Sequence, residues 1–233
     1  TALRNGRQTR AMQTVARERL DALVPALLAA VVRQPNATET LQRILPLIEA
    51  VARRSSYLLL LVENPGALLQ LVLLCSASPW IAQQLTSTPV LLDELLNTGT
   101  LYKAPEPEVL AADLRQQVLR INVDDLEAQM EALRYYRLAH VLRVAASEVT
   151  GKLPLMKVSD YLTWIAEAAL THVLDLAWQQ LTRKHGFPHR DDGSRCDPDF
   201  IIVGYGKLGG IELGYGSDLD LVFLHDADPN GVT

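Results

Sequence analysis

The pattern of hydrophobic positions divides the chain into a long helical part and a short part rich in glycine. Up to about His185, apolar residues recur three or four positions apart, which places them on one face of a helix. Beyond Gly186 this spacing is lost. Two short apolar runs, 200–203 and 219–224, have instead the β-branched and aromatic character of strands. The pattern therefore predicts a mainly α protein in which two strands follow the helices.

Prolines, glycines and capping residues predict where individual helices begin and end. The apolar stripe over 20–31 ends at a Gln-Pro-Asn break, and Thr38 is expected to cap the helix that follows. A long helix is expected to open at Asp124-Asp125, and Ser159 is expected to cap the last long helix. Gly186 should end that helix, because glycine readily takes the left-handed conformation found after helix C-termini.

The change in composition after the helices predicts the domain organisation. We expect a helical bundle domain over 1–186 and a polar connector over 187–198. Residues 199–233 would then be the truncated start of an α/β domain, since seven of the 13 glycines fall there. The chain opens without a methionine and ends soon after the second apolar run, so we expect a piece of a longer polypeptide.

Charge and cysteine content limit the classes of function. The net charge is −5, and all of this excess lies in residues 199–233, which argues against a non-specific nucleic-acid binder. Cys75 and Cys196 are predicted to be free thiols in a reducing compartment, which indicates a cytoplasmic protein. The most apolar stretch, 58–75, is interrupted by Glu-Asn-Pro-Gly, so no membrane span is expected.

Two aspartates begin the second apolar run. In an extended strand Asp218 and Asp220 would lie on one face, with Leu219 and Leu221 buried opposite. Adjacent carboxylates repel each other unless a cation lies between them. Mg²⁺ suits such a pair because it combines carboxylate oxygens with water and substrate phosphates. Two such ions could hold the attacking and leaving oxygens of a displacement at phosphorus.

A glycine-rich loop precedes the aspartates. Gly206, Gly209 and Gly210 would let the backbone approach a phosphate, and Lys207 could neutralise triphosphate charge. Ser217 could donate its hydroxyl to a phosphate or cap the turn. By spacing alone the glycines also match a dinucleotide-binding fingerprint, and an Asp-x-Asp pair alone is common on edge strands. Together in one segment between two strands, the motifs favour a nucleotidyl-transfer site.

The combination resembles the polymerase-β-like nucleotidyltransferase superfamily, which has a glycine pair on a turn, a spacer and then Asp-x-Asp on a strand. Lys207 departs from the superfamily, which has Ser or Gly at this place. The runs 206–213 and 216–221 resemble one family within it, the bacterial glutamine synthetase adenylyltransferases (glutamate–ammonia-ligase adenylyltransferases). The segments 57–65 and 78–80 are similar to that family as well.

The resemblance implies an activity, ligands and partners. Proteins of this family have two homologous halves, one that removes AMP from glutamine synthetase and one that adds it. This sequence resembles the C-terminal, adenylylating half. The resemblance implies transfer of AMP from ATP to a tyrosine hydroxyl of glutamine synthetase with Mg²⁺, under the control of a PII-type signalling protein and glutamine. Asp218 and Asp220 would bind the metal, and the nucleotide site would be lined by Gly206, Lys207, Gly209, Gly210 and Ser217.

The superfamily also uses a third carboxylate on a later strand. Asp226 and Asp228 follow the same strand too closely to supply it. We therefore expect this chain alone to be inactive or nearly so.

Two alternatives stay open at this point. The chain could belong to the phosphorolytic deadenylylating half, or residues 1–186 could be a helical interaction module that binds glutamine synthetase or a PII-type regulator. One helix also carries Arg134, Tyr135, Tyr136, Arg137 and Arg143, which we interpret as a solvated face, with a surface for nucleotide or a partner protein as the alternative.

Overall fold

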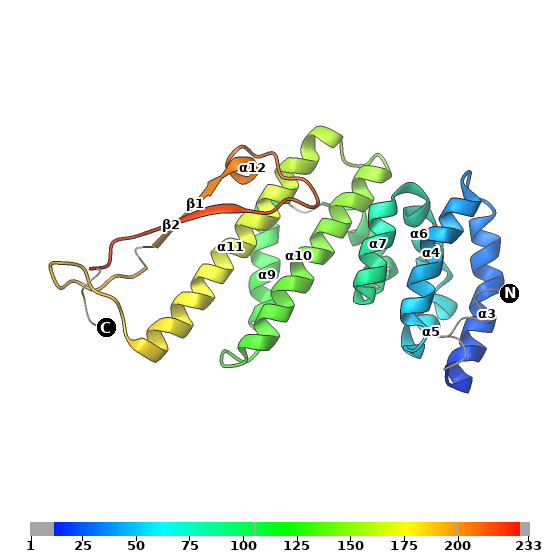
Figure 1. Ribbon diagram of the computed structural model, residues 1–233, viewed down its shortest axis with the longest axis horizontal. Helices are drawn as coiled ribbons and strands as arrows, with labels where there is room; N and C mark the ends of the chain where they lie inside the picture. Colours follow the sequence, from blue (N-terminus) through cyan, green and yellow to red (C-terminus); the bar gives the residue numbers. More distant parts are fainter. Residues whose placement is uncertain (1–11, 105, 199, 229–233) are drawn as a thin grey trace. The chain divides into compact units, whose positions relative to one another are not determined.

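A computed structural model describes residues 12–104, 106–198 and 200–228 (Figure 1). The protein is mainly helical, and its two strands pair with each other near the C-terminal end of the described chain. The fold class predicted from the hydrophobic pattern is thereby confirmed. The parts of the predicted domains that fall on residues 1–11, 105, 199 and 229–233 lie outside the described residues.

The described elements follow one another as a series of helices before the strands. In order they are α3 (Thr14–Val31), α4 (Ala37–Val51), α5 (Ser55–Glu63), α6 (Pro65–Ala77), α7 (Pro79–Ser87), the 3-10 helix η1 (Pro89–Leu96), α8 (Thr98–Leu101), α9 (Pro107–Val118), α10 (Leu126–Val149), α11 (Leu155–His185), β1 (Phe200–Tyr205), α12 (Gly206–Gly209) and β2 (Asp220–His225).

The contacts group the described chain into two compact units. The first contains the residues up to 104 together with 142–153, and the second contains 106–141 and the residues from 154 onward. Helix α10 contributes its first part to the second unit and its last part to the first. The predicted connector, 187–198, lies within the second unit, and its role as a domain boundary stays a prediction.

The first unit is organised around α6, which contacts α3, α4, α5, α7 and η1. Because neighbours surround it, α6 is apolar on most of its sides, and its residues Leu68, Leu71, Val72, Leu74 and Cys75 are all buried. No single helix among the described residues is long and apolar enough to cross a membrane. Helices α5 and α6 pass that test only as a pair, with a bend of 102° between them.

The two cysteines are both free, as predicted, and both are buried. Burial raises the pKa of the Cys75 thiol to about 12, although the positive charge of Arg43 opposes this shift. Because the thiolate is the nucleophilic form of cysteine, Cys75 is a packing residue at neutral pH. The backbone carbonyl oxygens of Cys75 and Ser76 each accept a hydrogen bond from Arg43 Nη1, at 3.0 Å and 2.8 Å.

Two predicted helix starts are wrong. Helix α4 begins one residue before Thr38 with Asn36 at its N-cap, and α11 begins at Leu155, so Ser159 lies inside it. The Asn36 amide is held by a tertiary contact, because its Nδ2 donates to the Ser76 carbonyl at 3.0 Å. Pro154 sets the start of α11, since its extended backbone (ψ 140°) cannot continue the preceding chain as a helix.

Other predicted helix ends are confirmed. Asp125 Oδ1 accepts a hydrogen bond of 3.0 Å from the backbone N–H of Ala128 in the first turn of α10. Gly186 ends α11 with φ 87°, a conformation that favours glycine, and its N–H donates to the Thr182 carbonyl at 3.0 Å.

The basic and aromatic residues of α10 do not share one solvated face, which corrects our interpretation of them. Tyr136 is fully buried, and its hydroxyl donates to the Leu110 carbonyl at 2.9 Å. Arg143 Nε donates to Glu94 Oε2 at 2.8 Å, and the Glu94 side chain is only 8% exposed. Arg134 and Arg137 are exposed. The helical repeat therefore places some of these basic and aromatic residues in the core and others at the surface.

Arg143→Ala is expected to destabilise the first unit, because it leaves the Glu94 carboxylate buried without its arginine partner. Breaking a buried ion pair in this way costs roughly 3 kcal/mol. Urea denaturation followed by circular dichroism measures the change in the free energy of unfolding. The matched control is Arg134→Ala on the same helix, whose pair with Glu131 is exposed and is worth about 0.5 kcal/mol or less. Equal losses of unfolding free energy in the two variants would contradict the larger contribution expected of the buried pair between Arg143 and Glu94.

Candidate functional site

The two strands bring the glycine loop and the aspartates to the same end of a hairpin. Strand β1 pairs with β2 in antiparallel register, from Phe200 opposite His225 to Tyr205 opposite Asp220. The chain leaves β1 directly into the short helix α12 and returns through a turn at 214–217 (Figure 1). Gly206 therefore follows the last residue of one strand, and Asp220 begins the strand beside it.

Gly206 and Asp220 are in direct steric contact. Gly206 has φ 53°, in the left-handed region where a Cβ is unfavourable. A Cβ built at this position would lie 2.3 Å from Asp220 Oδ2. The Asp220 carboxylate thus occupies the space that any other side chain at 206 would need, so glycine at this position places the carboxylate against the loop backbone.

The other glycines of the loop allow α12 to lie close to β1. A Cβ at Gly209 would come within 2.5 Å of the Gly204 carbonyl oxygen, and a Cβ at Gly204 would come within 2.8 Å of Leu208 Cδ2. Leu208 is buried by this approach. Gly210 has only ordinary contacts, the nearest at 3.4 Å. Close packing within the hairpin thus explains why glycines occur at the spacing that matches a dinucleotide fingerprint.

Ser217 closes the turn before the aspartates. Its Oγ accepts a hydrogen bond of 2.9 Å from the Gly214 N–H, and its own N–H donates to the Gly214 carbonyl at 3.1 Å. This is the capping role, one of the two predicted for Ser217. Since Oγ acts here as an acceptor, the hydroxyl proton is available to a further acceptor such as a phosphate oxygen. That second role stays a prediction.

Ile211 is a residue of the loop that the sequence did not reveal. Its φ of 56° is rare for a β-branched residue and marks local backbone strain. The surrounding hydrogen bonds fix it, because Ile211 N donates to Leu208 O (3.2 Å) and Glu212 N donates to Lys207 O (2.8 Å). A glycine would be the usual signal for this conformation, and the sequence has isoleucine instead.

The expected alternation of exposed aspartates and buried leucines over residues 218–221 is only partly correct. Asp220 begins β2, whereas Asp218 lies in the segment before the strand. Leu219 is 37% exposed and Leu221 is half-buried, so the prediction that both are buried opposite the carboxylates is wrong. Leu219 lies outside the strand ladder and lines a cavity formed with α10 and α11 instead.

Asp218, Asp220 and Lys207 are exposed to solvent. Within the part of the chain that the structure describes, neither aspartate forms an ion pair with a basic side chain. The same residues contain no group of three or more His, Cys, Asp or Glu side chains that could hold a metal ion. Two unneutralised carboxylates nevertheless fit Mg²⁺, which commonly takes one or two protein carboxylates and completes its shell with water and phosphate oxygens.

Comparison with known families decides the relationship. The model of the family described as Glutamate-ammonia ligase adenylyltransferase matches residues 68–232. The chain belongs to this family. The family predicted from the motifs at 206–213 and 216–221 is therefore confirmed, and the match extends back through the helices to the middle of the first unit.

Relatives with curated names agree with the family match. The chain is 64% identical over 231 residues to the bifunctional glutamine synthetase adenylyltransferase/adenylyl-removing enzyme of Pseudomonas aeruginosa, covering 99% of this chain and 24% of that protein. The proteins of the same name from Pseudomonas putida and Hahella chejuensis are 63% and 55% identical, over 99% and 97% of this chain and 24% of each relative. The chain thus spans about a quarter of the length of these adenylyltransferases.

Proposed function

We propose that this chain carries part of an adenylyl-transfer site, in which AMP passes from ATP to a tyrosine hydroxyl of glutamine synthetase. The observation that carries the proposal is the contact of the Asp220 carboxylate with Gly206, which joins the aspartates to the glycine loop. The names of the relatives support an adenylyltransferase with glutamine synthetase as its target. The tyrosine acceptor rests on the family resemblance.

The proposed reaction is a displacement at the α-phosphorus of ATP. The tyrosine oxygen forms a bond to this phosphorus as its hydroxyl proton leaves, and the bond between the α-phosphorus and the bridging oxygen breaks. Pyrophosphate departs with the electron pair of that bond. The products are AMP-tyrosine and pyrophosphate, so no oxidant or reductant is needed.

The residues of the hairpin have distinct roles in this proposal. Asp218 and Asp220 would hold Mg²⁺, which supplies positive charge to the phosphate oxygens when it is bound. The backbone at Gly206, Gly209 and Gly210 would line the phosphates closely. Lys207, exposed on α12, would offset triphosphate charge, and the Ser217 hydroxyl would donate a hydrogen bond to a phosphate oxygen. Control by a PII-type protein and by glutamine, and a cytoplasmic location, are parts of the same proposal.

The proposal also assigns the chain to the adenylylating half of the enzyme. The alternative is the deadenylylating half, which would use phosphate to release AMP as ADP. Assays of the full-length enzyme that carries this sequence separate the two. If the Asp218 and Asp220 site adds AMP, its disruption should abolish ATP-dependent labelling of glutamine synthetase and spare phosphate-dependent release of ADP. The opposite pattern would reject the assignment.

The chain of 233 residues alone is expected to transfer little or no AMP, because its described residues offer only two carboxylates at the site. The measurement is incorporation of α-labelled AMP into purified glutamine synthetase by this chain and by the full-length enzyme side by side. Transfer by the short chain at a rate near that of the full-length enzyme would contradict the need for a further carboxylate.

A further inference from the structure

A cavity of about 280 Å³ lies beside the turn at 214–217, within the second unit. It is formed by α10, α11 and residues 213–219. Most of its lining is apolar, and six of these side chains share one face of α11: Leu162, Ile165, Ala166, Ala169, Leu170 and Val173. Val173 is 45% exposed and Leu219 is 37% exposed, so part of the wall meets water. An apolar ligand would remove this surface from water, which favours binding.

One charged side chain lines this cavity, that of Arg137 on α10. Arg137 is exposed, and across residues 12–104, 106–198 and 200–228 its guanidinium forms no ion pair or hydrogen bond. None of the described residues that line the cavity is acidic. A guanidinium without a partner beside an apolar wall suits an apolar ligand with one anionic group. A carboxylate fits best, because its two oxygens match the planar fork of the guanidinium.

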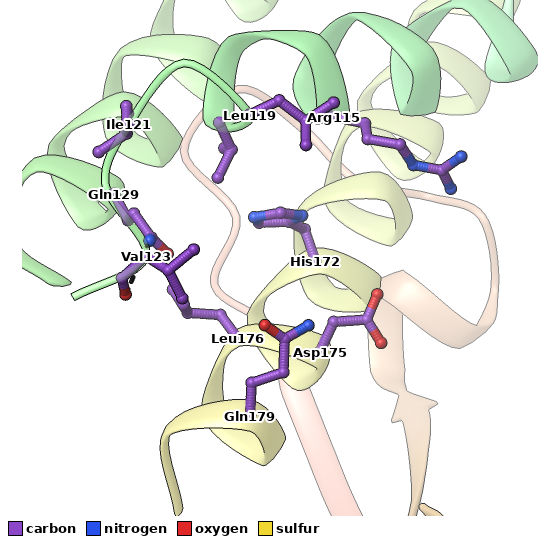
Figure 2. Close-up of a pocket in the computed structure, with 10 residues that line it drawn as sticks. Arg115, Leu119, Ile121, Val123, Gln129, His172, Asp175, Leu176 and Gln179 are labelled. Carbon is purple, nitrogen blue, oxygen red and sulfur yellow. Dashed lines mark hydrogen bonds between the residues drawn. The ribbon is translucent and has the colours of Figure 1, made fainter. Parts of the chain in front are cut away.

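The charges distinguish this cavity from a neighbouring one. Figure 2 shows the neighbour, which His172 enters and which Arg115 and Asp175 both line. The two cavities have no lining residue in common. The cavity at Arg137 lacks a negative charge, so an ammonium group would lie against its apolar wall without a partner, which is costly. It should therefore select monoanions over zwitterions and cations.

The cavity also contacts the segment that carries Asp218. Leu213 is buried, and two further lining residues, Ser217 and Leu219, flank the aspartate. The turn itself is closed by two hydrogen bonds between Gly214 and Ser217, of 2.9 Å and 3.1 Å. A ligand packed against Leu213 and Leu219 would restrict this segment further, on the side that faces α11.

We propose that this cavity binds a small apolar carboxylate, with its hydrocarbon part against α11 and its carboxylate at Arg137, and that the bound ligand holds the turn before Asp218 in place. The ligand is small because the volume is below the roughly 300 Å³ at which pockets for drug-sized molecules begin. The proposal goes beyond adenylyl transfer and does not depend on it, since binding is measured without nucleotide, metal or glutamine synthetase.

The test titrates the full chain with hexanoate, 4-methylpentanoate and phenylacetate, each separately. The methyl NMR signals of Val141, Leu213 and Leu219 report this cavity, and the imidazole signals of His172 report the neighbouring one. We expect at least one acid to shift the methyl signals first and to slow the amide hydrogen exchange of Ser217. The primary amide of that acid, which lacks the charge, should bind at least about tenfold more weakly. Acetate, which lacks the apolar part, should bind more weakly as well.

Arg137→Gln identifies the charge. It should weaken binding of the acid by about tenfold to a hundredfold, since it removes a charge-assisted hydrogen bond, and it should leave binding of the amide unchanged. The variant then no longer distinguishes acid from amide. Arg134→Gln is the matched control, an exposed arginine on the same helix that does not line the cavity.

Ala169→Leu fills the cavity from the face of α11 and should abolish binding of the acid. Its matched control is Ala177→Leu, at an exposed position of the same helix outside the cavity. Circular dichroism checks that all four variants keep the helical fold.

Several results would each overturn the proposal. They are the absence of methyl shifts at millimolar acid, a first shift at His172, equal binding of acid and amide, and equal losses for the variants at Arg137 and Arg134. Unchanged hydrogen exchange of Ser217 in the bound chain would overturn the effect on the turn.

Discussion

Replacing Asp218 and Asp220 together by asparagine is expected to reduce AMP transfer by the full-length enzyme by about a thousandfold or more. Asparagine keeps the shape of each side chain and removes its negative charge, so the proposed divalent cation would lose both of its ligands on this hairpin. The binding of glutamine synthetase should change little. The measurement is the rate at which label from α-labelled ATP enters purified glutamine synthetase.

The control for this variant is Asp191→Asn, another exposed aspartate of the second unit that lies outside the hairpin. Its activity should equal that of the unchanged enzyme. Because Asp218 and Asp220 are exposed, their replacement should leave the helical circular dichroism spectrum unaltered. Unchanged AMP transfer by the double asparagine variant would reject the assignment of the site.

Gly206→Ala is expected to be nearly as harmful, although it changes no functional group. The added Cβ would lie 2.3 Å from Asp220 Oδ2, so the carboxylate must move. A displacement of about 1 Å at a catalytic group can cost on the order of a hundredfold in rate. The left-handed backbone at φ 53° adds a strain of about 1–2 kcal/mol for a residue with a Cβ. Both effects are measured on the same variant, by AMP transfer and by urea denaturation.

Gly216→Ala is the matched control for this substitution, since a Cβ at Gly216 meets nothing within 4 Å and its φ is not in the left-handed region. We expect its activity and its stability to remain close to those of the unchanged protein. If Gly206→Ala behaves like Gly216→Ala, then the contact between the loop and Asp220 is not what positions the carboxylate.

The sequence predicted the elements of this fold better than their boundaries or contacts. Local patterns are sufficient for the stripe on α3, the turn at Gly186 and the two strands, because each depends on neighbouring residues. The predicted starts of α4 and α11 were wrong because the capping pattern does not decide where these two helices begin. Asn36 is fixed by the distant Ser76, and Pro154 limits the backbone more strongly than a serine can favour a cap.

The residues of the proposed site were also visible in the sequence, whereas their geometry was not. Composition and spacing indicated Gly206, Asp218 and Asp220 as a group. The register that sets Asp220 beside the loop arises from the pairing of two strands, and the strained Ile211 has no sequence signal.

The most direct test of the central claim is whether a divalent cation binds at Asp218 and Asp220. Mn²⁺ is a suitable probe, because it shares the oxygen ligands of Mg²⁺ and broadens nearby NMR signals. On titration of the chain, we predict that the amide signals of residues 206 and 218–220 broaden first, and that the double asparagine variant loses this effect. First broadening elsewhere, or the same broadening in the variant, would contradict the claim.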